Sequence, residues 1–188
     1  MTYVDAGEGQ SDTGAAVGVR LVSPEDVEEL TALLVAQWSF LEPWEPVRDP
    51  EWFTVEGQQA RVALALRDHE AGLSVPWVVT RGADIVGQVT LSGIVRGPFQ
   101  SANLGYWVAA ELNGRGVATA AVRRVLGIVF GELGLHRVQA GTLLHNHGSR
   151  RVLAKTGFTE IGVAPAYLCI QGRWQDHLLH QCLAPDGA

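Results

Sequence analysis

Cysteine is scarce in this 188-residue chain, which contains only Cys169 and Cys182. One pair is too few for a disulfide scaffold, and its spacing does not match a metal-binding motif. No apolar run approaches the length of a membrane span, and no basic start precedes an apolar segment as in a signal peptide. A cytoplasmic protein with no membrane contact is therefore the simplest expectation.

Positive charge is also in short supply. Fourteen Lys and Arg residues stand against 20 Asp and Glu, a net charge of −6, which argues against direct binding to nucleic acid.

Residues 1–18 are small, polar and glycine-rich, so we expect a flexible leader. Residues 19–188 are long enough for a single domain with a full core. Acidic residues gather over 42–51, where they form either a solvated loop or an attractive surface for a cationic substrate.

The hydrophobic periodicity predicts the element order β-α-α-β-β-β-α-β-α-β-β. This order indicates an α/β (α+β) fold, a mixed sheet with helices on both faces, and the helix after residue 116 should make its flanking strands parallel. Residues 39–53 contain three prolines and two tryptophans and are predicted to form a long loop that walls a pocket. The strands are expected at 19–22, 74–82, 83–96, 100–110, 136–144, 158–172 and 173–183, and the helices at 24–38, 54–72, 117–130 and 146–157.

The stretch NGRGVAT, residues 113–119, connects a strand to a helix through almost bare backbone. Small side chains allow close approach, and a helix N-terminus offers free N–H groups to an anion, so we expect a phosphorylated ligand. A Walker loop needs a Lys followed by Ser or Thr, which is missing. The dinucleotide fingerprint fits weakly, because Thr119 stands at its third glycine position.

The turn Asn113–Ala118 resembles the acetyl-coenzyme A turn, R/Q-x-x-G-x-G/A, of the GCN5-related N-acetyltransferases (GNAT). The order of LGYWV, NGRGVATAAV, FGELGLHRVQAGTLLHNHGSRRVLAKTGF and YLCIQGRWQDH resembles the ribosomal-protein alanine N-acetyltransferases of the RimJ/RimL type, over residues 19–183. The resemblance implies the GNAT fold, with a mostly antiparallel sheet and a splayed parallel strand pair at the cofactor site. Asn113 replaces the usual Arg or Gln, which affects cofactor affinity rather than the fold.

The resemblance also implies acetyl-CoA as co-substrate, with no metal. The pantetheine arm would pair with the strand at Trp107, Val108 and Ala109 and with the Asn146 amide. Arg115 and Arg150 could reach the phosphates or the adenosine. The remaining implied cofactor contacts are Asn113, Ser149 and the backbone N–H groups of Gly114, Arg115, Gly116, Val117, Ala118 and Thr119.

Acetyl transfer to an amine needs a hydrogen bond to the thioester oxygen, a proton for the leaving thiolate and a neutral amine. The N–H of Val108 or Ala109 is the expected oxyanion donor. Ser149 is the first candidate for protonating the thiolate, and Tyr167 is the second. Glu160 could act as a base through water, with Glu45 and Asp176 as alternatives.

We interpret Asp176 and His177 as a hydrogen-bonded pair near the substrate. His145 and His147 have no third ligand at suitable spacing, so no metal site is expected.

The acceptor implied by the resemblance is the N-terminal α-amine of a protein such as a ribosomal protein, acetylated by direct attack in a ternary complex. Trp44 and Trp52 would wall its slot beside Glu45. A small-molecule amine, such as an antibiotic or a metabolite, is the alternative acceptor. A non-catalytic CoA-binding module and a nicotinamide-dependent oxidoreductase are the outside alternatives. The sequence permits a monomer or a homodimer.

Overall fold

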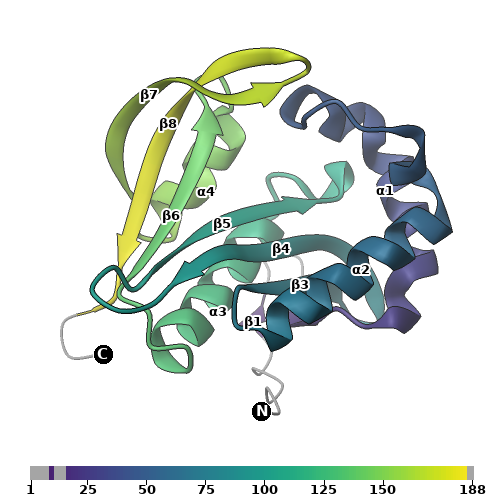
Figure 1. Cartoon of the computed structure of the whole chain (residues 1–188), viewed down its shortest axis with the longest axis horizontal. Coiled ribbons are helices and arrows are strands. Elements are labelled where there is room, and N and C mark those ends of the chain that lie inside the picture. The colour runs from purple at the N-terminus through teal and green to yellow at the C-terminus, as the bar shows by residue number, and fades with distance from the viewer. Residues whose placement is uncertain (1–8, 11–15, 186–188) are drawn as a thin grey trace.

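The described part of the chain folds into one twisted sheet with four α-helices (Figure 1). The structure, a computed structural model, describes residues 9–10 and 16–185. The helices are α1 (Val27–Leu41), α2 (Val55–Glu70), α3 (Val117–Gly131) and α4 (His147–Lys155). The strands are β1 (Gly9–Gln10), β2 (Ala16–Leu21), β3 (Ser74–Arg81), β4 (Asp84–Val95), β5 (Ser101–Val108), β6 (Arg137–Leu143), β7 (Thr159–Ile170) and β8 (Arg173–Leu183).

The strands lie in the order β1-β2-β3-β4-β5-β6-β8-β7. Neighbouring strands are antiparallel except β5 and β6, which are parallel and joined by α3. A mixed, mostly antiparallel sheet with its parallel pair at this crossover is what the sequence predicted.

Helices cover both faces of the sheet, with α1 and α2 on one face and α3 and α4 on the other (Figure 1). Successive residues of β3 show this, because side chains alternate between faces along a strand. Val78 belongs to a buried cluster with residues of α1 and α2, whereas Val79 belongs to a larger cluster built around α3. None of the helices in the described part of the chain is both long and apolar enough to span a bilayer.

The parallel strands separate soon after they meet. β5 pairs with β6 only where Ser101–Asn103 faces Arg137–Gln139. Beyond that point β5 stays with β4 as far as Val108, and β6 stays with β8 as far as Leu143. The sheet therefore opens between its two halves, as the family resemblance implied.

Two boundaries differ from the prediction. β2 begins at Ala16, so residues 16–18 and the short strand β1 belong to the sheet and not to a leader; residues 1–8 and 11–15 lie outside the described residues. The segment 39–53 is not a loop throughout, because α1 continues to Leu41 and is followed by 3-10 turns at Glu42–Trp44 and Pro50–Phe53. Prolines are tolerated there because they occupy the first turn, where no backbone hydrogen bond is lost.

The start of α1 is fixed to the end of β2 by the Asp26 carboxylate. Asp26 is 6% exposed, and its carboxylate accepts two hydrogen bonds of 2.7 Å from the Arg20 guanidinium and one of 2.8 Å from the Ser23 N–H. The Arg20 guanidinium holds the pKa of Asp26 below its usual value. The contact sets the direction of α1, whose far end reaches the opening in the sheet.

We expect Asp26→Asn to lower the free energy of unfolding by about 1–3 kcal/mol at pH 7, because the charge-assisted hydrogen bonds to Arg20 are lost. The folded pKa of Asp26 lies below its unfolded value of about 3.9, so the stabilisation is complete above that pH and is lost as pH falls through the folded pKa. Urea unfolding should show the difference from wild type shrinking below about pH 4. The exposed Glu28→Gln is the control. A deficit that does not change with pH would contradict this role.

Candidate active site

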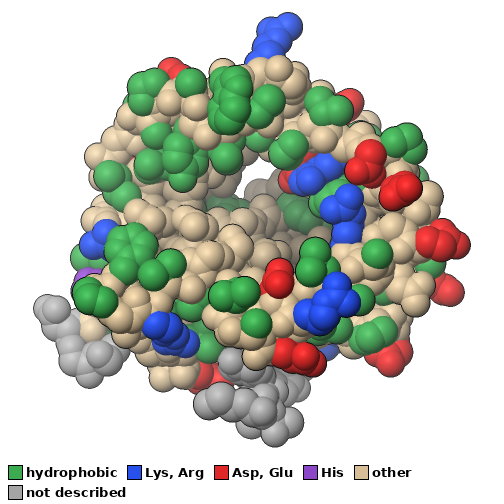
Figure 2. Space-filling view, in the orientation of Figure 1, with side chains coloured by type: hydrophobic (Ala, Val, Ile, Leu, Met, Phe, Trp, Pro, Cys, Tyr) green, Lys and Arg blue, Asp and Glu red, His purple; other side chains and the backbone are tan. Residues whose placement is uncertain are grey.

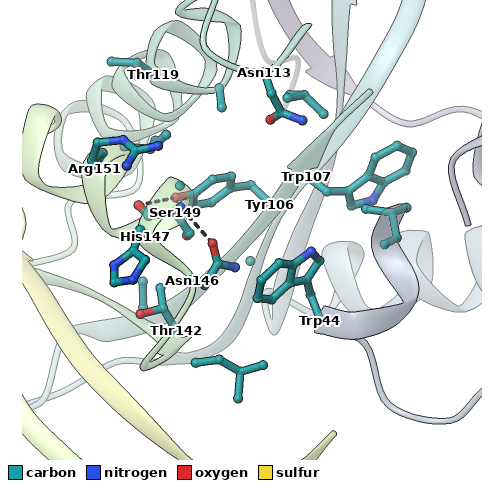
Figure 3. Close-up of a pocket in the computed structure, with 18 of the residues that line it drawn as sticks. Trp44, Tyr106, Trp107, Asn113, Thr119, Thr142, Asn146, His147, Ser149 and Arg151 are labelled. Atoms are coloured by element: carbon teal, nitrogen blue, oxygen red, sulfur yellow. Dashed lines mark hydrogen bonds between the residues drawn. The ribbon is translucent and has the colours of Figure 1, made fainter. Parts of the chain in front are cut away.

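A cavity of about 630 Å³ occupies the opening between β5 and β6, and the space-filling view shows the molecule hollowed there (Figure 2). Its walls come from Leu104–Val108 of β5, Ala140–Leu143 of β6, the glycine turn, α4 and the end of α1. Side chains that are distant in sequence therefore meet around one space (Figure 3).

Beyond Asn103, β5 presents unpaired backbone groups to this cavity. The Ala109 N–H donates to Val86 O at 2.8 Å, and hydrogen-bonded and non-hydrogen-bonded pairs alternate along the β4–β5 ladder. Tyr106 and Val108 therefore direct their N–H and C=O groups away from β4 and towards the space that β6 has left. Of the two predicted oxyanion donors, Val108 directs its N–H towards the cavity, while the Ala109 N–H is bonded to β4.

The glycine turn leads into a helix N-terminus that no side chain caps. Gly114 and Gly116 have φ angles of +73° and +82°, a region that favours glycine. The N–H groups in the first turn of a helix lack intrahelical partners, and Val117–Thr119 line the cavity. Arg115 is placed differently from expectation, because its N–H donates to Leu112 O at 3.3 Å and it does not line the cavity.

The Asn113 side chain, the departure from the family pattern, lines the cavity and donates from Nδ2 to Ala110 O at 3.0 Å. It therefore fixes the backbone just before the glycine turn. The short Asn side chain stabilises the turn that holds the helix N-terminus open.

Asn146 and Ser149 both line the cavity at the start of α4. Asn146 caps the helix, accepting from the Ser149 N–H at 3.0 Å. The Ser149 Oγ lies 2.8 Å from the hydroxyl of Tyr106, a residue that the sequence analysis did not single out (Figure 3). Burial raises the pKa of Tyr106 to about 12, and its hydrogen bond to Ser149 opposes this effect. The phenol stays protonated at neutral pH and can donate to Ser149.

α4 presents a cationic face to the cavity. His147, Arg151 and Lys155 all line it, at intervals of four residues that place them on one side of a helix. Arg150 and Glu160 do not line it; they form an ion pair with each other at 3.1 Å, outside the cavity. The predicted phosphate arginine and the predicted base are therefore not brought to the site. The four-residue spacing from His147 was the signal for Arg151.

The opposite end of the cavity is aromatic and acidic. It is lined by Trp44, whose ring centre lies 5.4 Å from that of His145, and by Glu45, whose carboxylate pairs with Arg48. Trp52 does not reach the cavity, contrary to expectation. Its ring is held between guanidinium groups, with Arg48 Cζ at 3.6 Å and the Cζ of Arg61 at 4.1 Å.

β7 and β8 complete this end. Tyr167 is 43% exposed and outside the cavity lining, and its ring packs against His177 with centres 5.6 Å apart. His177 is 4% exposed and does line the cavity. Asp176 accepts from the Ala166 N–H at 2.9 Å, and His177 bonds instead through Nδ1 to Gln175 O, so the expected pair is not observed. Among the described residues, no three His, Cys, Asp or Glu side chains gather as metal ligands.

A parallel strand pair that opens beside an uncapped helix N-terminus, with basic side chains on the adjoining helix, suits a ligand that carries phosphate groups. The sequence model of the family described as Acetyltransferase (GNAT) domain matches residues 17–159. The chain belongs to this family of acetyl-CoA-dependent N-acetyltransferases.

Its relatives include the [Ribosomal protein uS5]-alanine N-acetyltransferase of Escherichia coli, 33% identical over 170 residues, or 89% of this chain and 88% of the relative. The crystal structure of the ribosomal-protein-S5-alanine acetyltransferase from Vibrio fischeri has a TM-score of 0.88 at 32% identity, covering 96% of this chain and 100% of that one. Mycobacterium smegmatis RimJ in complex with CoA-disulfide has a TM-score of 0.87 at 35% identity, covering 90% and 83% of the two chains.

Arg151→Ala should raise the Kd for acetyl-CoA about tenfold or more, because a hydrogen bond to a charged group contributes about 1.5–3 kcal/mol. Arg150→Ala removes the same charge from the same helix outside the cavity, and its Kd should stay within about twofold of wild type. Isothermal titration calorimetry at two salt concentrations measures both values, and the wild-type dependence on salt should weaken only in Arg151→Ala. An equal rise in Kd in the two variants would show that α4 attracts acetyl-CoA through its overall positive charge and not through a contact of Arg151.

Proposed function

We propose that this protein transfers the acetyl group of acetyl-CoA to the N-terminal α-amine of a protein, with both substrates bound together. A ribosomal protein in the cytoplasm is the favoured acceptor, since ribosomal proteins are the acceptors named for two of the relatives described above. The cavity supports this function because side chains from both faces of the sheet line it, basic on one side and aromatic and acidic on the other.

The cofactor side of the cavity is the face covered by α3 and α4. The pyrophosphate would accept hydrogen bonds from the N–H groups of Val117–Thr119, where the helix dipole favours an anion. Arg151 and Lys155 would neutralise further phosphate charge. The pantetheine arm would take the place of a strand beside β5, bonding to the backbone of Tyr106 and Val108. Acetyl-CoA supplies the acetyl group already activated as a thioester.

The acceptor side is the face of α1 and α2. Ala140 packs in the core of the α3 side, so by alternation Gly141 and Leu143 point towards the other face, where Trp44 and Glu45 lie. The aromatic ring provides an apolar contact surface. The Glu45 carboxylate provides a negative charge that would attract an ammonium group.

The proposal of a chain terminus as acceptor rests on a contact across this side, between the β7–β8 hairpin and the end of α1. Gln171, at the tip of the β7–β8 hairpin, donates from Nε2 to Glu42 O at 2.7 Å and to Glu45 O at 3.2 Å. Its backbone N–H donates to Glu45 O at 3.3 Å. The hairpin and the end of α1 are thus joined over the acceptor side (Figure 1). This contact narrows the entrance to the acceptor side, which favours an extended chain end over an amine on a folded surface.

In the reaction, the Val108 N–H would donate to the thioester oxygen as it gains negative charge. The Ser149 hydroxyl would donate its proton to the departing sulfur, with Tyr106 donating in turn to Ser149. An α-amine has a pKa of about 8, so about a tenth is neutral at pH 7, against about one in two thousand for a lysine amine. The larger neutral fraction therefore favours an N-terminal α-amine, the same acceptor that the narrowed entrance favours.

Ser149→Ala should lower kcat by about 10²-fold, because proton transfer to a leaving group contributes about 10²–10⁴-fold. The KM for acetyl-CoA should change little, since Ser149 is not required for holding the phosphates. Tyr106→Phe should have a smaller effect on kcat, because the serine hydroxyl remains. Steady-state release of free thiol measures both. A loss in Tyr167→Phe with full activity in Ser149→Ala would assign the proton donor to the tyrosine instead.

The acceptor is tested with three substrates at equal concentration: a peptide with a free N-terminal alanine, the same peptide with a blocked N-terminus and an internal lysine, and spermidine. We expect acetylation of the free N-terminus alone, measured by mass spectrometry. Gln171→Ala should raise the KM for that peptide without changing the Kd for acetyl-CoA. Faster turnover of spermidine would identify a small-amine acetyltransferase, and binding of acetyl-CoA with no turnover of any amine would leave a CoA-binding module.

A further inference from the structure

We infer that His177 is the proton acceptor for the incoming amine, a role that neither the sequence nor the relatives assign. The inference rests on the proposed function, since it concerns the same cavity and the same reaction. It is carried by the burial of the ring, its hydrogen bonding and its place on the acceptor side.

His177 reaches the cavity from β8, where it pairs with Leu143 of β6. Its ring lies beside Gly141, since a Cβ atom at that position would stand 3.7 Å from the His177 Cδ2. Gly141 faces the acceptor side, opposite to Ala140 in the α3 core. The imidazole therefore lies on the side from which the amine arrives, and not among the phosphate-binding groups.

Hydrogen bonding fixes the tautomer of this ring. The His177 Nδ1 lies 3.0 Å from the carbonyl oxygen of Gln175, and a carbonyl can only accept. Nδ1 therefore carries the proton of the neutral imidazole, and Nε2 carries a lone pair. No described residue forms a hydrogen bond with Nε2. The ring of Tyr167 packs against the imidazole at an interplanar angle of 53°, which restricts its rotation.

The other titratable groups around this end are less well placed. Glu45 lines the same cavity but its carboxylate is paired with Arg48. His145 also lines the cavity, but it is exposed and packs against Trp44. Asp176, next to His177 in β8, accepts from the Ala166 N–H. His177 alone combines burial, a fixed tautomer and an available lone pair.

The proton balance assigns each step to an atom. His177 Nε2 takes one proton from the acceptor ammonium, which leaves a neutral amine with its lone pair. The amine nitrogen then attacks the thioester carbonyl carbon, forming the C–N bond, and the C–S bond breaks. The second proton leaves the nitrogen for water as the amide forms, while the Ser149 hydroxyl gives its proton to the thiolate sulfur and regains one from water. His177 returns its proton to water, so the net reaction releases one proton.

His177→Gln tests the role by the pH dependence of kcat/KM for the alanine peptide. We expect a loss of about tenfold at pH 7, because without the imidazole only about a tenth of the α-amine is neutral there. The loss should shrink above about pH 9, where an α-amine with a pKa of about 8 is neutral without help. The Kd for acetyl-CoA should be unchanged.

His180→Gln is the matched control, because His180 is also buried, at 2% exposure, in the same strand but does not line the cavity. It should keep the wild-type pH profile whatever stability it loses. An unchanged pH profile in His177→Gln, or the same change in both variants, would overturn the proposal.

A second readout uses the wild-type protein without turnover and so does not depend on variants that fold. Nitrogen-detected NMR of His177 should show the proton on Nδ1. In the complex with CoA, the free alanine peptide should change the chemical shift of His177 Nε2 more than the N-acetylated peptide does, because only the free amine can donate a hydrogen bond to that lone pair. The same Nε2 chemical shift with both peptides would overturn the proposal. If the proposed acceptor is wrong, the wild-type enzyme will acetylate another amine instead. The role of His177 can then be tested separately, by comparing that amine with its acetylated form.

Discussion

β5 and β6 stop pairing after Asn103 and Gln139, and every other feature of the site depends on that separation. Backbone groups buried inside a sheet are costly to leave unpaired. The protein places those of Tyr106 and Val108 in a cavity, where a ligand can satisfy them. The cost of opening the sheet is confined to one place, because β4 and β8 continue to support the two separated strands.

The separation also gives the cavity two chemically different sides. Side chains alternate along β5 and β6, so each strand contributes to both faces of the sheet. On the side of α3 and α4 the cavity meets an uncapped helix N-terminus and the cations of α4, which suit phosphates. On the side of α1 it meets Trp44, Glu45 and His177, which suit an amine. Donor and acceptor can therefore meet at the gap without competing for the same surface.

Most of the fold could be predicted from the sequence, because hydrophobic periodicity reports burial directly. The stripe of α3, including Val117, Val125 and Ile128, is fully or almost fully buried, and α4 begins at residue 147, within one residue of its predicted start. The glycine turn could also be predicted, for a different reason. Gly114 and Gly116 adopt a left-handed backbone conformation that other residues avoid.

The details of the site depended on contacts that no local pattern encodes. Tyr106 meets Ser149 across 43 residues of chain, and Gln171 meets Glu42 across 129. Trp52 was assigned to the cavity from its neighbours in sequence, but two arginines hold its ring elsewhere. Arg150 and Arg151 differ by only one position, and the turn of the helix decides which of them faces the cavity. Which of these side chains line the cavity is therefore decided by tertiary packing.

Amide hydrogen exchange with and without CoA tests the central claim most directly, namely that the cofactor bonds to the backbone exposed where β5 leaves β6. The account predicts that CoA slows exchange at Tyr106, Val108 and the first turn of α3, Val117–Thr119. The amides of Trp107 and Ala109 belong to the β4 ladder and should be protected in both states. Protection by CoA elsewhere, with Val108 and Val117–Thr119 unchanged, would contradict the account.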